Sequence, residues 1–196
     1  MSGDGGSAPA CAFVIFGVTG DLTERKLMPA LYQLHVHGSL HEESVIIGHA
    51  RSELTDETLR RRMAEALERE VPGFDPVAWQ ALAPRLHYIR GAYDQPEGFE
   101  KLAALLDELG LPGRVFYTAT PPAVYEDIAR GLDEAGLTTE PEGGFARLVV
   151  EKPFGFDLLS AKELNSALLA RFREHQLFRI DHYLAKETAQ NLAVLR

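Results

Sequence analysis

The stretch AFVIFGVTGDL, residues 12–22, joins a short apolar run to a glycine turn and the start of a helix. Five consecutive apolar residues from Ala12 to Phe16 predict a strand that is buried on both faces. Gly17 permits the tight turn that follows, and leucines spaced along one face predict a helix over 22–36. A buried strand, a glycine turn and a helix in this order indicate the first unit of an α/β fold.

The same alternation of apolar strands and amphipathic helices continues along the chain. Further strands are predicted over 45–47, 86–89, 115–117, 148–150 and 178–180. Further helices are predicted after Thr55 as far as 67, and over 99–109, 124–132, 158–172 and 186–196, with Thr55 and Asp157 as N-caps. Because the strands do not alternate apolar with polar residues, we expect a doubly wound (Rossmann-type), mostly parallel sheet with helices on both faces.

Composition bounds the classes of protein to which the chain can belong. It has 196 residues, which is enough for one domain or for one domain and part of another. The net charge of −9 argues against a nucleic-acid surface, and no apolar run is long enough to cross a membrane. A single cysteine, Cys11, allows no internal disulfide and fits a reducing, cytoplasmic setting. Residues 1–11 are small and polar at their start, and we expect a disordered leader there.

The glycine turn is a candidate phosphate-binding loop. Gly17 and Gly20 have the spacing G-x-x-G, and Asp21 and Leu22 follow at the start of the predicted helix. Glycines let a diphosphate approach the backbone, where the free amides and the positive end of the helix stabilise it. The spacing differs from the common G-x-G-x-x-G, and Thr23 stands where a third glycine would be. A plain strand-to-helix turn would explain the same residues.

The second strand leads into a candidate cation for the coenzyme. Arg51 follows this strand, where an arginine suits the 2′-phosphate of NADP and an acidic residue suits the ribose hydroxyls of NAD. A solvated surface arginine is the alternative. His49 and Glu53 are also expected to flank the site.

Two later motifs carry candidate substrate ligands. Glu151-Lys152-Pro153 follows a predicted strand and places a lysine at the mouth of the sheet. The segment RIDHYLAKE, residues 179–187, holds the densest group of polar side chains in the chain. In it His182 and Lys186 suit a phosphomonoester, and Asp181 suits the orientation of a histidine base. A charged, solvated face is the alternative for this segment.

Three histidines near the end of the first predicted helix are candidate metal ligands by residue type. They are His35, His37 and His41. A metal site needs ligands gathered on one face at suitable spacing, so surface histidines are the better interpretation and no metal is predicted. Asp94, Tyr117 and Tyr125 are interpreted as structural.

Taken together, the motifs resemble those of the glucose-6-phosphate dehydrogenase family. They are GVTGDL at 17–22, HARS at 49–52, FYTATPPAVY at 116–125, VEKPFG at 150–155 and, most specific, QLFRIDHYLAKETAQNLAVLR at 176–196. The resemblance implies oxidation of glucose 6-phosphate at C1, transfer of the hydride to NADP and formation of 6-phosphogluconolactone, the chemistry of the pentose phosphate pathway. It implies an NADP-binding domain over 12–182 and the start of a substrate domain over 183–196.

The resemblance also implies roles for individual residues. The coenzyme loop is expected to comprise Gly17, Thr19, Gly20, Asp21 and Leu22. Arg51 is expected to bind the 2′-phosphate, and Lys152 to lie between coenzyme and sugar. The sugar phosphate is expected to contact His182, Tyr183 and Lys186, and Asp181 is expected to pair with the catalytic histidine.

The sequence departs from the family pattern in three ways. Thr19 replaces a more usual serine, Ala185 replaces a glycine, and the family chain is longer and carries its histidine base in a second domain. We therefore expect the 196 residues to be inactive or nearly so alone, with a missing C-terminal half or a homo-oligomer as partner. The rival interpretations are a non-catalytic NADP-binding module, a subunit of a split enzyme, and a sugar-nucleotide reductase or epimerase. The last needs Tyr-x-x-x-Lys, and Tyr183 and Lys186 are one residue too close for it.

Overall fold

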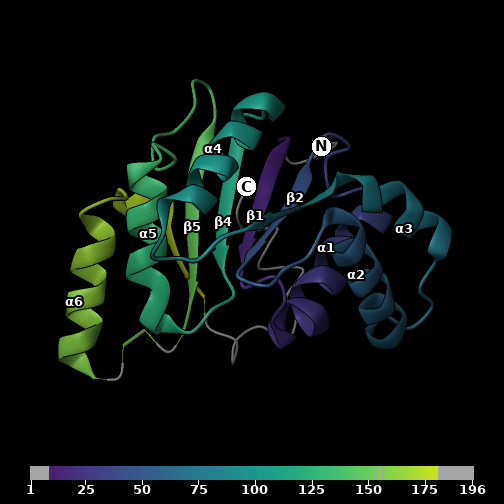
Figure 1. The fold of residues 1–196 in the computed structure, drawn as a ribbon, viewed down its shortest axis with the longest axis horizontal. Coiled ribbons are helices and arrows are strands. Elements are labelled where there is room, and N and C mark those ends of the chain that lie inside the picture. Colours follow the sequence, from purple (N-terminus) through teal and green to yellow (C-terminus); the bar gives the residue numbers. More distant parts are fainter. Residues whose placement is uncertain (1–8, 153, 156, 181–196) are drawn as a thin grey trace, which may run out of the picture.

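The computed structural model describes residues 9–152, 154–155 and 157–180. Within them one sheet contains six parallel strands in the order β3-β2-β1-β4-β5-β6 (Figure 1). The strands are β1 (Cys11–Phe16), β2 (Val45–Ala50), β3 (Leu86–Arg90), β4 (Gly113–Thr118), β5 (Phe145–Glu151) and β6 (Leu177–Ile180). Each strand predicted from an apolar run is confirmed, and most extend a few residues beyond that run.

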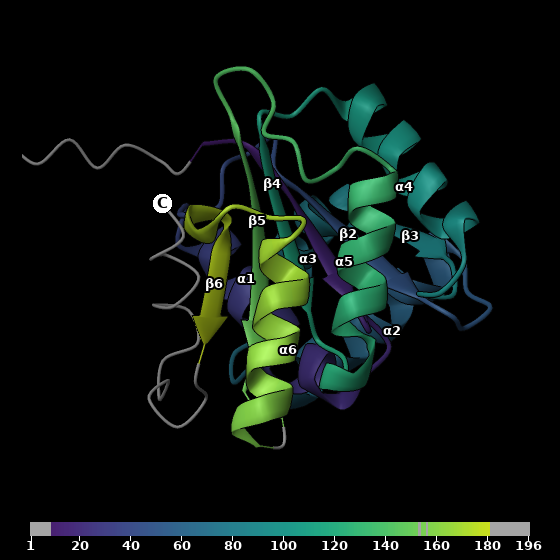
Figure 2. The ribbon, with the colours of Figure 1, turned by 90° about the vertical axis from the view of Figure 1, so that its left-hand side faces the viewer.

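Helices cover both faces of the sheet. They are α1 (Met28–Val36), α2 (Asp56–Glu70), α3 (Pro76–Leu82), α4 (Pro96–Leu109), α5 (Tyr125–Glu134) and α6 (Leu158–Leu169). The first three lie on one face and the last three on the other (Figure 2). Alternate residues of β1 serve the two layers, since Phe13 and Ile15 pack toward α1 and α2 while Val14 and Phe16 pack toward α4 and α5. The doubly wound Rossmann-type architecture is therefore confirmed.

Several helix boundaries match their sequence signals. Thr55 caps α2 in a capping box with Thr58, and Asp157 caps α6 in the same way with Ser160. Gly110 ends α4 in the left-handed conformation that a glycine C-cap adopts, with φ at 60°.

Parts of the helices differ from the prediction, including the end of α6, which lies at Leu169 and not at 172. The first helix opens with a π-helical turn, Thr23–Leu27, before the α-helical part begins. Helix α3 was missed because it is only seven residues long, although Asp75 caps it and the buried Trp79 anchors it. Leu158, which the leucine spacing predicts on the apolar face of α6, is instead 72% exposed. The helix predicted over 186–196 lies outside the described residues.

The strand order creates the ligand-binding position typical of this fold. The chain runs from β1 outward to β2 and β3, then returns to β4 on the other side of β1. The loops that follow β1 and β4 therefore leave the sheet in opposite directions, and ligands of doubly wound sheets bind at that crevice.

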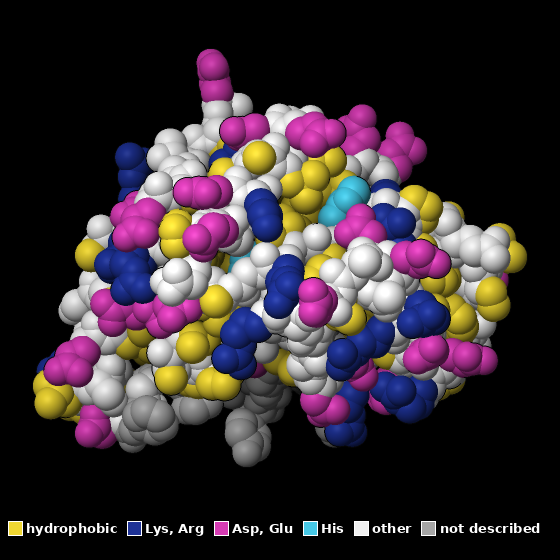
Figure 3. Space-filling view, viewed as in Figure 1, with side chains coloured by type: hydrophobic (Ala, Val, Ile, Leu, Met, Phe, Trp, Pro, Cys, Tyr) yellow, Lys and Arg dark blue, Asp and Glu magenta, His cyan; other side chains and the backbone are white. Residues whose placement is uncertain are grey.

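The face drawn in Figure 3 mixes Lys and Arg side chains with Asp and Glu side chains, in keeping with the net charge of −9. In the described part of the chain, no helix is both long and apolar enough to span a membrane.

Candidate functional site

The glycine loop lies at the switch point and touches the loop after β4. Gly17 has φ at +84°, and its amide donates to the His49 carbonyl oxygen at 2.9 Å. A Cβ on Gly17 would lie 2.4 Å from the Ala119 carbonyl oxygen, so both the conformation and the space require glycine. The Ala119 amide in turn donates to the Phe16 carbonyl at 2.9 Å. The first glycine of the motif is thus fixed by contacts with two neighbouring strands.

The rest of the loop closes onto the first helix. The Gly20 amide donates to the Gly17 carbonyl at 2.9 Å, and the buried Thr23 hydroxyl donates to the same oxygen at 3.3 Å. Thr23 therefore has a structural reason to replace a third glycine. Asp21 and Leu22 begin the helix, where backbone amides have no acceptor one turn earlier. Such amides form an anion-binding position at a helix N-terminus.

A second glycine makes room for the loop. Val18, in the middle of the motif, is fully buried. A Cβ on Gly48 of β2 would lie 2.7 Å from the Val18 methyl groups. Gly48 thus allows Val18 to pack against β2, which holds the loop close to the sheet.

Arg51 lies immediately beyond β2 and is exposed. The Tyr88 hydroxyl donates to the Ser52 carbonyl at 2.6 Å and lies 3.1 Å from the Ala50 carbonyl, so Tyr88 fixes the backbone on both sides of Arg51. Glu53, which we expected beside the coenzyme, forms an exposed ion pair with Arg90 at 3.1 Å. Arg51, the cation expected to bind a 2′-phosphate, thus follows β2, which lies beside β1, and the glycine loop follows β1.

His49 does not flank the site with its side chain, contrary to the prediction. The strand β2 continues through it, and the ring is fully buried among Phe16, Tyr93 and Phe99, with ring centroids 5.1–5.6 Å away. Burial lowers the pKa of His49 to about 4, so the ring is neutral at pH 7. Only its carbonyl oxygen, which accepts from Gly17, reaches the loop.

Tyr93 belongs to the candidate site, although no motif of the sequence selects it. It follows β3 and packs on His49 and, edge-on, on Phe16. Burial raises the pKa of Tyr93, while a hydrogen bond with the Gly17 backbone and the charge of Arg51 lower it in part. Tyr93 therefore lies near both Gly17 and Arg51.

Lys152 follows β5 at the same edge of the sheet. Its amide donates to the Ile180 carbonyl of β6 at 3.1 Å. The neighbouring Glu151 carboxylate is 9% exposed and accepts a hydrogen bond from the Tyr117 hydroxyl of β4. The Tyr125 hydroxyl donates to the Glu151 carbonyl at 3.4 Å.

The two tyrosines have a definite role beside this lysine. Burial, and then the negative charge of Glu151, hold the pKa of Tyr117 well above its ordinary range, so the phenol keeps its proton. Burial also raises the pKa of Tyr125. Tyr117 holds the side chain of Glu151 and Tyr125 holds its carbonyl, next to Lys152, in keeping with the structural interpretation of both tyrosines.

Four predicted site residues, Asp181, His182, Tyr183 and Lys186, lie outside the described residues. The described chain reaches Ile180, which pairs in the sheet with Glu151.

The three histidines near the end of α1 have other partners than a metal ion. His35 Nδ1 accepts from the Arg85 guanidinium at 2.8 Å, His41 Nδ1 accepts from the Glu43 amide at 3.2 Å, and His37 Nδ1 donates to the Gln33 carbonyl at 2.7 Å. Among the residues that the structure describes, no three His, Cys, Asp or Glu side chains are grouped so that they could hold a metal ion.

Comparisons with known proteins agree with this geometry. Residues 14–191 match the family model described as glucose-6-phosphate dehydrogenase, NAD binding domain. The chain is 39% identical to glucose-6-phosphate 1-dehydrogenase of Chlamydia muridarum, with 97% of this chain and 39% of the relative covered. It is 42% identical to the enzyme of the same name from Dickeya dadantii, covering 97% and 38%. The chain thus spans about two fifths of the length of these curated relatives.

Solved structures give the same result. A glucose-6-phosphate dehydrogenase in complex with its substrate glucose 6-phosphate superposes with a TM-score of 0.82 at 37% identity, covering 97% of this chain and 40% of that one. The Mycobacterium avium glucose-6-phosphate 1-dehydrogenase gives a TM-score of 0.81 at 36% identity, covering 96% and 40%. From its motifs, its switch-point loop and these matches, the chain belongs to the glucose-6-phosphate dehydrogenase family, of which it contains the NAD-binding domain.

Proposed function

We propose that this chain is the coenzyme-binding part of an NADP-dependent dehydrogenase that oxidises glucose 6-phosphate to 6-phosphogluconolactone. The observation that carries the proposal is the glycine loop at the switch point with Arg51 at the end of the adjacent strand. The substrate is supported by a relative at 37% identity that was solved with glucose 6-phosphate bound.

The residues present fit a phosphorylated dinucleotide. Gly17 has no room for a Cβ beside Ala119, so only glycine lets the loop turn this close to the end of β4. Gly17, Thr19, Gly20, Asp21 and Leu22 would hold the diphosphate through backbone amides and the helix N-terminus. When bound, NADP supplies the acceptor for the hydride.

Arg51 is the residue that would select NADP over NAD. It is exposed, and its backbone is fixed by Tyr88. A guanidinium can bind a phosphate through two parallel hydrogen bonds, each charge-assisted, whereas the ribose hydroxyl of NAD offers no negative charge. Loss of Arg51 is therefore expected to weaken NADP binding and to leave NAD binding nearly unchanged.

The sugar would bind at the edge of the sheet formed by β5 and β6. Lys152 would lie between coenzyme and sugar, with its turn held by Tyr117, Tyr125 and Glu151. His182, Tyr183 and Lys186 would bind the phosphate of the sugar. Asp181 would orient a histidine base, and no residue of these 196 is assigned as that base. Turnover by this chain alone is therefore expected to be absent or very slow, because general acid–base catalysis contributes about 10²–10⁴-fold.

Calorimetric titration of NADP and of NAD into the purified 196-residue chain tests the proposal. Arg51→Ala should weaken NADP by roughly tenfold or more, the equivalent of one charge-assisted contact, and leave NAD within about twofold. Arg61→Ala, which removes an exposed arginine of α2, is the matched control and should change neither affinity. Equal loss of both coenzymes in Arg51→Ala, or no binding of either by the wild type, would overturn the proposal.

A further inference from the structure

Helix α2 directs an arginine against the glycine loop. The Arg62 Nη2 donates to the Thr19 carbonyl oxygen at 2.7 Å, and its Nε donates to a Glu24 carboxylate oxygen at 2.6 Å. Thr19 belongs to the loop, and Glu24 belongs to the π-helical turn that follows it. One guanidinium therefore joins α2, the loop and the start of the first helix.

This contact fixes one peptide of the loop at both ends. The carbonyl of the Thr19–Gly20 peptide accepts from Arg62, and its amide donates to the Gly17 carbonyl at 2.9 Å. A peptide is planar, with its carbonyl and amide on opposite sides. The peptide therefore cannot rotate without breaking one of these two hydrogen bonds.

Glu24 binds a second arginine of α2, Arg69, which serves as a control for Arg62. Its side chain is 17% exposed, and its second oxygen accepts from Arg69 at 3.3 Å. Arg69 lies further along α2 and also pairs with Glu70 at 2.9 Å. Arg62 and Arg69 thus share a carboxylate, but of the two Arg62 is the one that donates to the loop.

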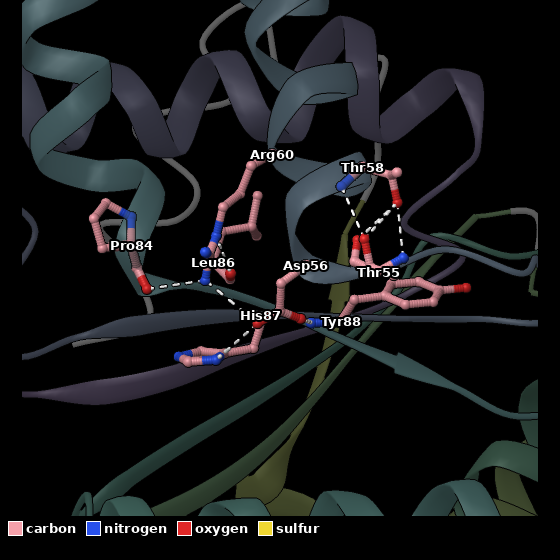
Figure 4. A network of polar contacts seen from close by, with 8 residues as sticks. All are labelled: Thr55, Asp56, Thr58, Arg60, Pro84, Leu86, His87 and Tyr88. Carbon is pink, nitrogen blue, oxygen red and sulfur yellow. Dashed lines mark hydrogen bonds and ion pairs between the residues drawn. The ribbon is translucent and has the colours of Figure 1, made fainter.

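The position of Arg62 is set by the sheet. At the start of α2, Asp56 accepts from the Tyr88 amide at 2.7 Å, and the Arg60 Nε donates to the Leu86 carbonyl at 2.9 Å (Figure 4). These contacts attach the first turns of α2 to β3. Arg62 follows within the next turn and is therefore presented to the loop by a fixed helix.

We propose that Arg62 is a positioning residue for the coenzyme loop. It holds the Thr19 carbonyl toward α2, which leaves the remaining loop amides preorganised for the diphosphate. The inference rests on the proposed function, in which this loop binds a dinucleotide. Because NADP and NAD share the diphosphate, loss of Arg62 weakens both coenzymes equally, whereas loss of Arg51 weakens NADP alone.

Titration of NADP and NAD into Arg62→Gln, Arg62→Lys and Arg69→Gln chains tests this role. Arg62→Gln is expected to weaken both coenzymes by roughly tenfold, about the value of one charge-assisted hydrogen bond. Arg62→Lys keeps the charge but lacks the fork, so it should also weaken both. Arg69→Gln should stay within about twofold of wild type, since a surface ion pair contributes little.

Amide hydrogen exchange of Gly20 in the coenzyme-free chain tests the contact between Arg62 and the loop independently of coenzyme binding. The Gly20 amide should exchange faster in Arg62→Gln than in wild type or Arg69→Gln. If the wild type bound neither coenzyme, the proposed function would fail, but this exchange rate would still decide whether Arg62 holds the Thr19–Gly20 peptide. Unchanged Gly20 exchange, equal affinities in Arg62→Gln and Arg69→Gln, or a loss confined to NADP would overturn the inference.

Discussion

His49→Leu is expected to make the domain more resistant to acid. The His49 ring is fully buried, and neither of its nitrogens has a hydrogen-bond partner among the described residues. Leucine is apolar and close to histidine in size, so the replacement removes a titratable group without removing a hydrogen bond. The surrounding rings of Phe16, Tyr93 and Phe99 remain to pack against it.

The magnitude follows from the lowered pKa of His49. It falls from an ordinary value of 6.5 to about 4 in the folded protein. As the pH drops, the unfolded chain therefore binds the proton first, so the stability is complete above pH 6.5 and is lost toward pH 4. The whole effect is about 3 kcal/mol, and between pH 7.5 and pH 5 it is about 2 kcal/mol.

Urea unfolding at pH 7.5 and at pH 5 measures this difference. The wild type should lose about 2 kcal/mol more than His49→Leu between the two pH values. His37→Leu removes an exposed histidine and serves as the control, with a loss close to that of the wild type. If His49→Leu lost as much stability as the wild type between the two pH values, the inference that His49 is buried and neutral would be wrong.

Three further changes have defined outcomes. Gly98→Ala would place a Cβ 2.7 Å from His49 Nε2 and should cost about 1–3 kcal/mol in urea unfolding, partly regained in a double variant with His49→Ala. Thr55→Ala removes the N-cap of α2 and should cost about 1 kcal/mol, measured as a lower urea midpoint with an unchanged slope. Tyr88→Phe frees the backbone around Arg51 and should weaken NADP several-fold in calorimetry but not NAD, whereas an equal effect on both coenzymes would contradict this role.

The strands could be predicted because parallel strands buried on both faces must be apolar. The end of a strand could not be predicted where small or polar residues interrupt its apolar run. The strand β2 was ended too early because Gly48 and His49 break its apolar run, although both are required, one by the packing of Val18 and one by its aromatic surroundings. The π-helical turn at Thr23–Leu27 leaves no signal in apolar spacing.

Some residues of the candidate site could be predicted from the sequence, and others could not. Gly17, Gly20 and Arg51 could be selected because they follow strands whose order the pattern predicts. Arg62 and Tyr93 could not, since they reach the loop only through the packing of α2 and of the segment after β3. Their role depends on which distant residues meet in space, and no local spacing encodes that.

The central place of β1 has a consequence for how the domain assembles. Cys11 in β1 pairs with Gly113 in β4, which follows 102 positions later, and the Gly17 loop is completed by contact with Ala119 beyond that strand. Contacts between such distant segments form late, because the chain must first close a large loop. A chain emerging from the ribosome therefore has its first strand and both loop glycines long before β4 and Ala119, whose contacts shape the loop, have been synthesised.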